Sequence, residues 1–322
     1  MSNEKDLTVK KAFDLAIQNH QNNNLQDAQN YYQKVLKIDP NHVNAHNNLG
    51  VIFQKLEEHQ KAKSCYEKAI EIDSSYAHAH NNLGNLLLKE LKRNEEAKIC
   101  LEKAIEIDSN YAHAHNNLGI VFQELGEHHK ARDCYEKTIE LNPNYADVHF
   151  NLGVIFQELK ENQKAKDCYE KAIEIDPNYV GSHNNLGNIF NELEENQKAI
   201  GCYEKAIEIN PNFADAYNNL GIIYKELGKN KKAKNCYEKA IEINSNYVEA
   251  HYNLGLLFKE LRENEKAKNC YEKAVEIDPL NKKYMIAYGK ILLFFDDKFK
   301  GYEYIKKGAG VIKFTPSYSK II

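Results

Sequence analysis

A glycine recurs along most of the chain at a nearly constant spacing of 34 residues, which becomes 35 at one step. The members of this series are Gly50, Gly84, Gly119, Gly153, Gly187, Gly221 and Gly255, with Gly289 as a weaker member. A period of this size is typical of a solenoid, in which small similar units stack and each contacts only its neighbours. By length alone, 322 residues would suggest about two domains, and the period replaces that expectation.

The repeat boundaries follow when the glycine is placed at position 8 of each unit. The eight units are then 9–42, 43–76, 77–111, 112–145, 146–179, 180–213, 214–247 and 248–281. Residues 1–8 are an N-terminal extension, and the first unit is divergent because Ala16 stands at the glycine position. Residues 282–322 begin a degenerate ninth unit, which we expect to cap the last repeat. The alternatives for this segment are a junction to a further domain, or self-association through its apolar residues.

Each unit carries the apolar spacing of two helices. In unit 146–179 the first apolar face comprises Val148, Leu152, Ile155, Phe156 and Leu159. The second comprises Ala165, Cys168, Tyr169, Ala172, Ile173 and Ile175. Pro177 then ends the second helix, because proline cannot continue the hydrogen-bond ladder. The pattern therefore predicts an all-α fold built from helix-turn-helix repeats.

The residues at these positions resemble the consensus of the tetratricopeptide repeat (TPR). In unit 180–213 the matching residues are Leu186, Gly187, Phe190, Ala199, Tyr203, Ala206 and Pro211. The resemblance implies a right-handed superhelix, an α-solenoid. It also implies that the first helices line a concave groove and that the second helices form the convex back.

Three features depart from that consensus. Position 4, often tryptophan in the family, is histidine in six units: His46, His80, His115, His149, His183 and His251. Position 32, usually proline, is Ser74, Ser109 and Ser245 in three units. Unit 77–111 has one extra residue between its helices, near Leu91 to Asn94, and we expect it to alter that turn.

Composition excludes several classes of partner. The net charge of −4 argues against a nucleic-acid interface, which normally needs a basic face. No run approaches the roughly 18 apolar residues of a membrane span, and the first residues lack the apolar core of a secretory signal. We therefore expect a cytoplasmic protein with reduced thiols and with neither nucleic acid nor membrane as a partner.

The repeated cysteines and histidines are expected to be structural. All seven cysteines occupy position 23, and none has the spacing of a metal-ligand pair: Cys65, Cys100, Cys134, Cys168, Cys202, Cys236 and Cys270. His78 and His80 are two residues apart on a helix, so they point in different directions and cannot share a metal ion. Phosphate loops, G-x-S-x-G elbows and H-E-x-x-H motifs are missing from the sequence. We expect no metal, no cofactor and no catalytic site.

Asparagine is unusually abundant, with 39 copies, and its placement is informative. Position 6 is Asn48, Asn82, Asn117, Asn151, Asn185, Asn219 and Asn253. Position 5 adds Asn47, Asn81, Asn116, Asn184 and Asn218. Asparagine is a poor residue for the middle of a helix, so the two rows call for an explanation. Either the amides satisfy neighbouring groups or remain solvated, or the position-6 row grips a peptide backbone, since a carboxamide both donates and accepts.

The position-6 row is similar to the asparagine ladder in the TPR superhelix of protein O-GlcNAc transferases, although their catalytic domain is absent from this chain. Position 13 changes from Lys55 and Lys89 to glutamate in later units. Either these residues are a solvated rim, or they favour a ligand that is acidic and then basic along its length. We therefore predict a non-catalytic scaffold that binds extended segments of partner proteins. The alternative is the substrate-recruiting module of a glycosyltransferase or other modifying enzyme, acting in cis in a longer homologue or in trans.

Overall fold

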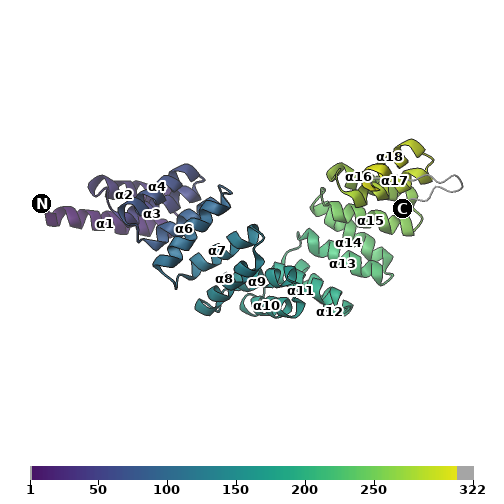
Figure 1. The fold of residues 1–322 in the computed structure, drawn as a ribbon, viewed down its shortest axis with the longest axis horizontal. Coiled ribbons are helices and arrows are strands. Elements are labelled where there is room, and N and C mark those ends of the chain that lie inside the picture. The colour runs from purple at the N-terminus through teal and green to yellow at the C-terminus, as the bar shows by residue number, and fades with distance from the viewer. Residues whose placement is uncertain (1, 310–322) are drawn as a thin grey trace. The chain divides into compact units, whose positions relative to one another are not determined.

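The chain folds entirely into helices over residues 2–309, the part that the structure, a computed structural model, describes (Figure 1). The eighteen helices are α1 (Ser2–Gln21), α2 (Leu25–Ile38), α3 (Val43–Lys55), α4 (His59–Ile72), α5 (Ala77–Lys89), α6 (Asn94–Ile107), α7 (Ala112–Glu124), α8 (His128–Leu141), α9 (Ala146–Glu158), α10 (Asn162–Ile175), α11 (Val180–Glu192), α12 (Asn196–Ile209), α13 (Ala214–Glu226), α14 (Asn230–Ile243), α15 (Val248–Glu260), α16 (Asn264–Ile277), α17 (Lys282–Phe294) and α18 (Lys298–Ala309). The expected all-α helical-repeat fold is therefore confirmed. Contacts divide the chain into two compact parts, Met1–Ile175 and Asp176–Ile322. From here on these parts are called the first and the second unit, and the 34-residue segments are called repeats.

Helices pack in consecutive pairs, and each second helix also contacts the first helix of the next pair within its unit. The core of a pair is a tyrosine ring at position 24 pressed against the glycine at position 8. At Gly187 an added Cβ would lie 2.6 Å from Cε1 of Tyr203, closer than real carbon atoms approach. The same contact recurs from Gly50 with Tyr66 to Gly255 with Tyr271, except at Gly84, where Leu101 takes the place of the tyrosine. The period in the sequence is therefore the period of one close helix-helix contact.

The turn inside each pair needs one residue in the left-handed conformation. Gly126 and Gly228 fill it with φ of 73° and 69°, whereas Lys160 and Glu194 adopt it with φ near 60°. Lys160 and Glu194 are strained in this conformation because their Cβ crowds the following carbonyl, whereas glycine has no Cβ. The extra residue in repeat 77–111 lengthens this turn, as expected: α5 ends at Lys89 and α6 begins only at Asn94.

The histidines at position 4 tie each pair to the loop that precedes it. All six donate from Nε2 to a backbone carbonyl, over 2.8–3.1 Å: His46 to Pro40, His80 to Ser74, His115 to Ser109, His149 to Pro143, His183 to Pro177 and His251 to Ser245. The structural interpretation of these histidines is thereby confirmed. The partner is always the carbonyl at position 32, which proline and serine supply equally. This explains why three repeats tolerate serine there.

The last two described helices, α17 and α18, pack as a pair, and α17 also contacts α16. In α17, Gly289 lies against α18, where an added Cβ would meet the Gly301 carbonyl at 2.7 Å. Residues 310–322, which the sequence offered as a junction or a self-association segment, lie outside the described residues. Within residues 2–309, no helix combines the length and the apolar character needed to cross a lipid bilayer.

Candidate functional site

The predicted binding asparagines all lie on first helices of the pairs. In the first unit Asn48, Asn82, Asn117 and Asn151 lie on α3, α5, α7 and α9. In the second unit Asn185, Asn219 and Asn253 lie on α11, α13 and α15. Successive first helices contact each other, α3 with α5 and α5 with α7 in one unit, α11 with α13 and α13 with α15 in the other. Position 6 of one repeat therefore lies within reach of the repeat before it.

In the first unit the two asparagine rows join into one hydrogen-bonded chain. Asn117 donates to Asn81 over 3.0 Å, and Asn81 donates to Asn82 over 3.3 Å. Asn82 donates to Asn47 over 2.9 Å, and Asn47 donates to Asn48 over 3.2 Å. The chain ends where Asn48 donates to the hydroxyl of the buried Tyr32 over 3.3 Å. The position-5 amides are buried, so these bonds remove the penalty of leaving them unpaired.

The second unit repeats the pattern. Asn253 donates to Asn218 over 3.0 Å, Asn218 to Asn219 over 3.3 Å, and Asn219 to Asn184 over 3.1 Å. Asn184 then donates to Asn185 over 3.2 Å. The rule is the same in both units: position 6 donates to position 5 of the preceding repeat, and position 5 donates to position 6 of its own. We call this arrangement the amide ladder.

The amide ladder is interrupted at α9, where position 5 is Phe150 instead of asparagine. The Phe150 ring packs 5.8 Å from the Tyr169 ring. The buried Oδ1 of Asn116 has no hydrogen-bond partner among the described residues, although Asn151 is at the position that would donate to it. The side chain of Asn151 is half-buried, and no hydrogen bond from its amide to residues 2–309 is found. Asn151 therefore keeps a full set of donors and acceptors.

An amide within the ladder, such as Asn82, keeps some of its hydrogen-bond donors and acceptors free for a ligand. A carboxamide carries two N–H donors and two acceptor lone pairs. Asn82 uses one donor toward Asn47 and one lone pair toward Asn81, so within the described structure one of each remains. Asn82 is only half-buried, and the neighbouring position-9 side chains Val51, Ile120 and Val154 are half-buried as well. The face therefore offers amide groups beside partly exposed apolar surface.

Charged residues at position 13 lie at the exposed ends of the same helices. In the first unit these residues are Lys55, Lys89, Glu124 and Glu158, all exposed. In the second unit they are Glu192, Glu226 and Glu260. Lys225 partly offsets the last of these, since its Nζ lies 2.7 Å from Glu260.

A row of alternating tyrosine and histidine rings, which the sequence analysis did not anticipate, follows the N-terminal ends of first helices in the first unit. The ring centroids of Tyr76 and His78 are 5.4 Å apart, and those of His78 and Tyr111 are 5.0 Å apart. Each step from Tyr111 to His113 and from His113 to Tyr145 is 6.1 Å. The sequence carries this pattern, since a tyrosine at position 34 of one repeat is followed by a histidine at position 2 of the next. These rings add an aromatic edge to the candidate site.

The cysteines do not form a second site. All seven are free and half-buried, so they are more exposed than the core position predicted for them. Burial raises the pKa of Cys65 and Cys100 to about 11, and burial with nearby carboxylates raises that of Cys134 to about 12. These thiols are protonated near neutral pH and are poor nucleophiles. Among the described residues, no three His, Cys, Asp or Glu side chains are grouped as a metal site requires.

Comparison with known sequences identifies the repeats. Models described as "Tetratricopeptide repeat" match residues 111–178, 168–201 and 248–281, and one described as "TPR repeat" matches residues 187–228 and 223–262. These matches run without a gap from residue 111 to residue 281, which is more than half of the chain. A model of the "Cilia and flagella-associated protein 70 middle TPR-like domain" matches residues 13–142. No curated protein sequence matches the chain.

Solved structures share the fold. PilF of Pseudomonas aeruginosa is 24% identical with a TM-score of 0.55, over 61% of this chain and 89% of that one. The Cut9-Hcn1 hetero-tetramer of the APC/C is 17% identical with a TM-score of 0.62, over 88% of this chain and 52% of that one. YrrB, described as a TPR protein with an unusual peptide-binding site, is 26% identical with a TM-score of 0.49, over 57% and 95%. The continuous repeat matches and the helical-repeat fold together show that the chain belongs to the tetratricopeptide-repeat family of protein-interaction scaffolds.

Proposed function

We propose that this chain is a non-catalytic scaffold that binds extended segments of partner proteins along its first helices, with the position-6 asparagines as backbone anchors. The observation that carries the proposal is the amide row itself: six of its seven anchors are half-buried, Asn117 is buried, and the partly exposed apolar side chains Val51, Ile120 and Val154 lie beside it. An extended peptide presents N–H and C=O groups that such amides complete. Each amide-to-backbone bond would contribute about 0.5–1.5 kcal/mol.

Asn151 is the strongest anchor in this proposal. Amides within the ladder already use one N–H donor and one acceptor in hydrogen bonds to each other, as Asn82 does with Asn47 and Asn81. The Asn151 amide forms no hydrogen bond with the described residues, and the neighbouring Phe150 ring offers an apolar contact. We therefore place the best-ordered part of a bound segment at α9.

The charges at position 13 give the proposed segment a direction within the first unit. Lys55 and Lys89 favour acidic residues near α3 and α5, whereas Glu124 and Glu158 favour basic residues near α7 and α9. Since exposed charges act mainly on association and are screened by salt, this preference should weaken at high ionic strength.

Site-specific photocrosslinking tests the proposal. A benzoylphenylalanine at Val154, on α9, is irradiated in native lysate, and the same group at the exposed Glu170 of α10 is the control. Captured peptides are mapped by mass spectrometry. We expect segments captured from Val154 that are missing from Glu170, and a loss of that capture when Asn151 is changed to alanine. Capture that is the same at both positions, or indifferent to Asn151→Ala, would contradict the proposal.

The rival function, recruitment of substrates to a modifying enzyme, uses the same surface and is favoured by the similarity of the asparagine row to the glycosyltransferase ladder. It predicts that a transferase co-purifies with the full chain and that the captured segments carry its modification. For location, we propose a reducing compartment such as the cytoplasm, because all seven cysteines are free thiols.

A further inference from the structure

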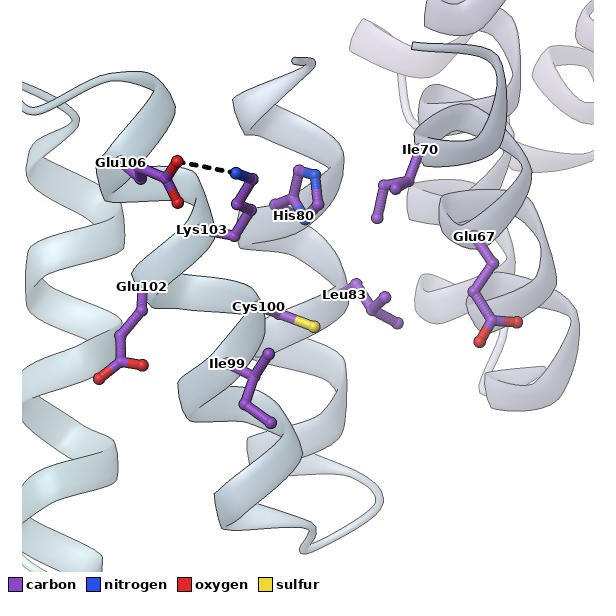
Figure 2. A pocket seen from close by; sticks show the side chains of 9 residues that line it. All are labelled: Glu67, Ile70, His80, Leu83, Ile99, Cys100, Glu102, Lys103 and Glu106. Atoms are coloured by element: carbon purple, nitrogen blue, oxygen red, sulfur yellow. Dashed lines mark hydrogen bonds and ion pairs between the residues drawn. The ribbon is translucent and has the colours of Figure 1, made fainter. Parts of the chain in front are cut away.

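The second helices of the first unit carry an apolar cleft that the amide ladder does not use. Its volume is about 490 Å³, enough for two or three side chains. Figure 2 shows Glu67 and Ile70 of α4 on one wall, Ile99, Cys100 and Lys103 of α6 on the other, and His80 and Leu83 of α5 between them. The cleft therefore opens between consecutive second helices.

Ile99 is what sets this cleft apart from the equivalent surfaces of other repeats. Its side chain is 67% exposed in the middle of α6. The same position, 22, is polar or glycine in every other repeat: Asn30, Ser64, Asp133, Asp167, Gly201, Asn235 and Asn269. An isoleucine is therefore not required for folding at this position. Its exposed surface would be covered favourably by an apolar side chain from a partner.

The residues that line the cleft beside Ile99 include the apolar side chains of Ile70 and Leu83. Leu83 is buried beneath it, and the Nε2 of His80 is engaged by the carbonyl of Ser74 at 3.1 Å. Burial raises the pKa of the Cys100 thiol to about 11, so it remains uncharged at neutral pH. The lining thus suits an aliphatic side chain.

The rim of the cleft carries one unpaired carboxylate. Glu67 is paired with Lys63 at 2.9 Å. Glu106 is paired with Lys103, also at 2.9 Å (Figure 2). Glu102 forms no ion pair within residues 2–309, because Lys98, four residues before it, extends over the Phe122 ring at 5.6 Å. In three other repeats the equivalent pair is made: Lys63 with Glu67, Lys166 with Glu170, and Lys234 with Glu238. A basic group beside the apolar contact would restore the missing pair.

We propose that this cleft docks a short segment of a partner protein that inserts an aliphatic side chain against Ile99 and sets an adjacent lysine or arginine on Glu102. The site lies on α4, α5 and α6 and is independent of the function proposed for the first helices. It would let the chain hold two partner segments at once, one on each set of helices.

Parallel peptide selection tests this site. Random twelve-residue peptides displayed on phage are selected against the full chain and, separately, against its Ile99→Asn variant. Asparagine occupies position 22 in three other repeats, so the variant should fold, and circular dichroism checks this. We expect a set of peptides enriched only on the unchanged chain, sharing an aliphatic residue next to lysine or arginine. Identical sets, or a specific set without that pairing, would overturn the proposal.

One selected peptide is then titrated by fluorescence anisotropy. Ile99→Asn should weaken its binding at least tenfold. Glu102→Gln should weaken it about threefold and flatten its salt dependence, as expected for one exposed charge pair. Asn235→Ala, at position 22 of another repeat, should change nothing. Binding that withstands Ile99→Asn would refute the site, and so would sedimentation showing that Ile99 instead mediates pairing between two copies of the chain.

Discussion

At the scale of single residues, each repeat depends on the contact between a glycine and a tyrosine ring. Gly187 has no room for a Cβ because Cε1 of Tyr203 would lie 2.6 Å away. Gly201, on the partner helix of the same repeat, has nothing within 4 Å of its missing Cβ. The two glycines are therefore opposite cases within one helix pair.

Gly187→Ala is expected to destabilise the protein by about 1–3 kcal/mol, the usual range for overpacking a core. Gly201→Ala is expected to stabilise it by about 0.5–1 kcal/mol, since alanine is the better residue in a helix interior. Urea unfolding followed by circular dichroism measures both. If Gly187→Ala raised the midpoint, the close contact would not be what fixes the glycine period.

The amide ladder separates two kinds of asparagine at the same repeat position. Asn82 bonds both Asn47 and Asn81, and these partners are buried. Asn151 bonds none of the described residues. A stability measurement should therefore distinguish them before any ligand is known.

Asn82→Ala should lower stability by about 1–3 kcal/mol because two buried amides lose a partner. Asn151→Ala should leave stability unchanged or raise it by about 0.5 kcal/mol through better helix propensity. The free energies come from urea unfolding of both variants beside the unchanged chain. Equal losses at both positions would mean that the ladder does not end at α9.

At the scale of helices and turns, the sequence predicts where each pair of helices breaks but not how the chain turns there. The 34-residue period marks the break, yet Lys160 and Glu194 are not turn residues by type, and their left-handed φ follows from the packing of the two helices. The extra residue in repeat 77–111 was visible in the sequence, and it moved the left-handed residue to Lys92, with φ of 53°.

Glu194→Gly should stabilise the protein by about 1 kcal/mol, because glycine removes the strain of a left-handed side-chain residue. The reverse change, Gly228→Ala at the equivalent turn with φ of 69°, should destabilise it by a similar amount. Thermal unfolding of the two variants checks both signs. A loss of stability on Glu194→Gly would show that the glutamate side chain contributes more than its backbone strain removes.

At the scale of the whole molecule, the row of cysteines makes folding sensitive to alkaline pH. Burial raises the pKa of Cys65 and Cys236 to about 11 and that of Cys168 to about 12, above the ordinary value near 8.5. Between about pH 9 and 11 the unfolded chain loses thiol protons that the folded chain retains. The contribution of these thiols to the free energy of unfolding is therefore fully present below about pH 8.5, and it is lost as the pH rises through that window.

The free energy of unfolding should fall steadily from pH 8 to pH 10.5. Changing Cys65, Cys134 and Cys168 to alanine should make that fall shallower, the remaining slope coming from the buried tyrosines, whose pKa is also raised. Native thiols should also react slowly with iodoacetamide at pH 8 and quickly once urea is added. A flat pH profile, or fast native labelling of all seven, would contradict the assignment.

The sequence predicted the candidate site only in outline. It identified both asparagine rows, because repeat positions are visible without coordinates. It did not show that Asn82 pairs with Asn47 of the preceding repeat, since that pairing depends on the offset between neighbouring helices. The exposed Ile99 was missed, although the polar residues at position 22 of the other repeats indicate a surface position there.

The amide ladder also has a direction, because its bonds run head to tail from Asn117 to Tyr32 and each bond between repeats donates to the preceding repeat. Aligned amide dipoles polarise one another, so each bond is strengthened by those on either side. Removing Asn82 should therefore weaken the bonds that remain, and a second loss at Asn117 should cost less than it does alone. The rungs would then behave as one cooperative element, whose stiffness grows with the number of repeats that share it.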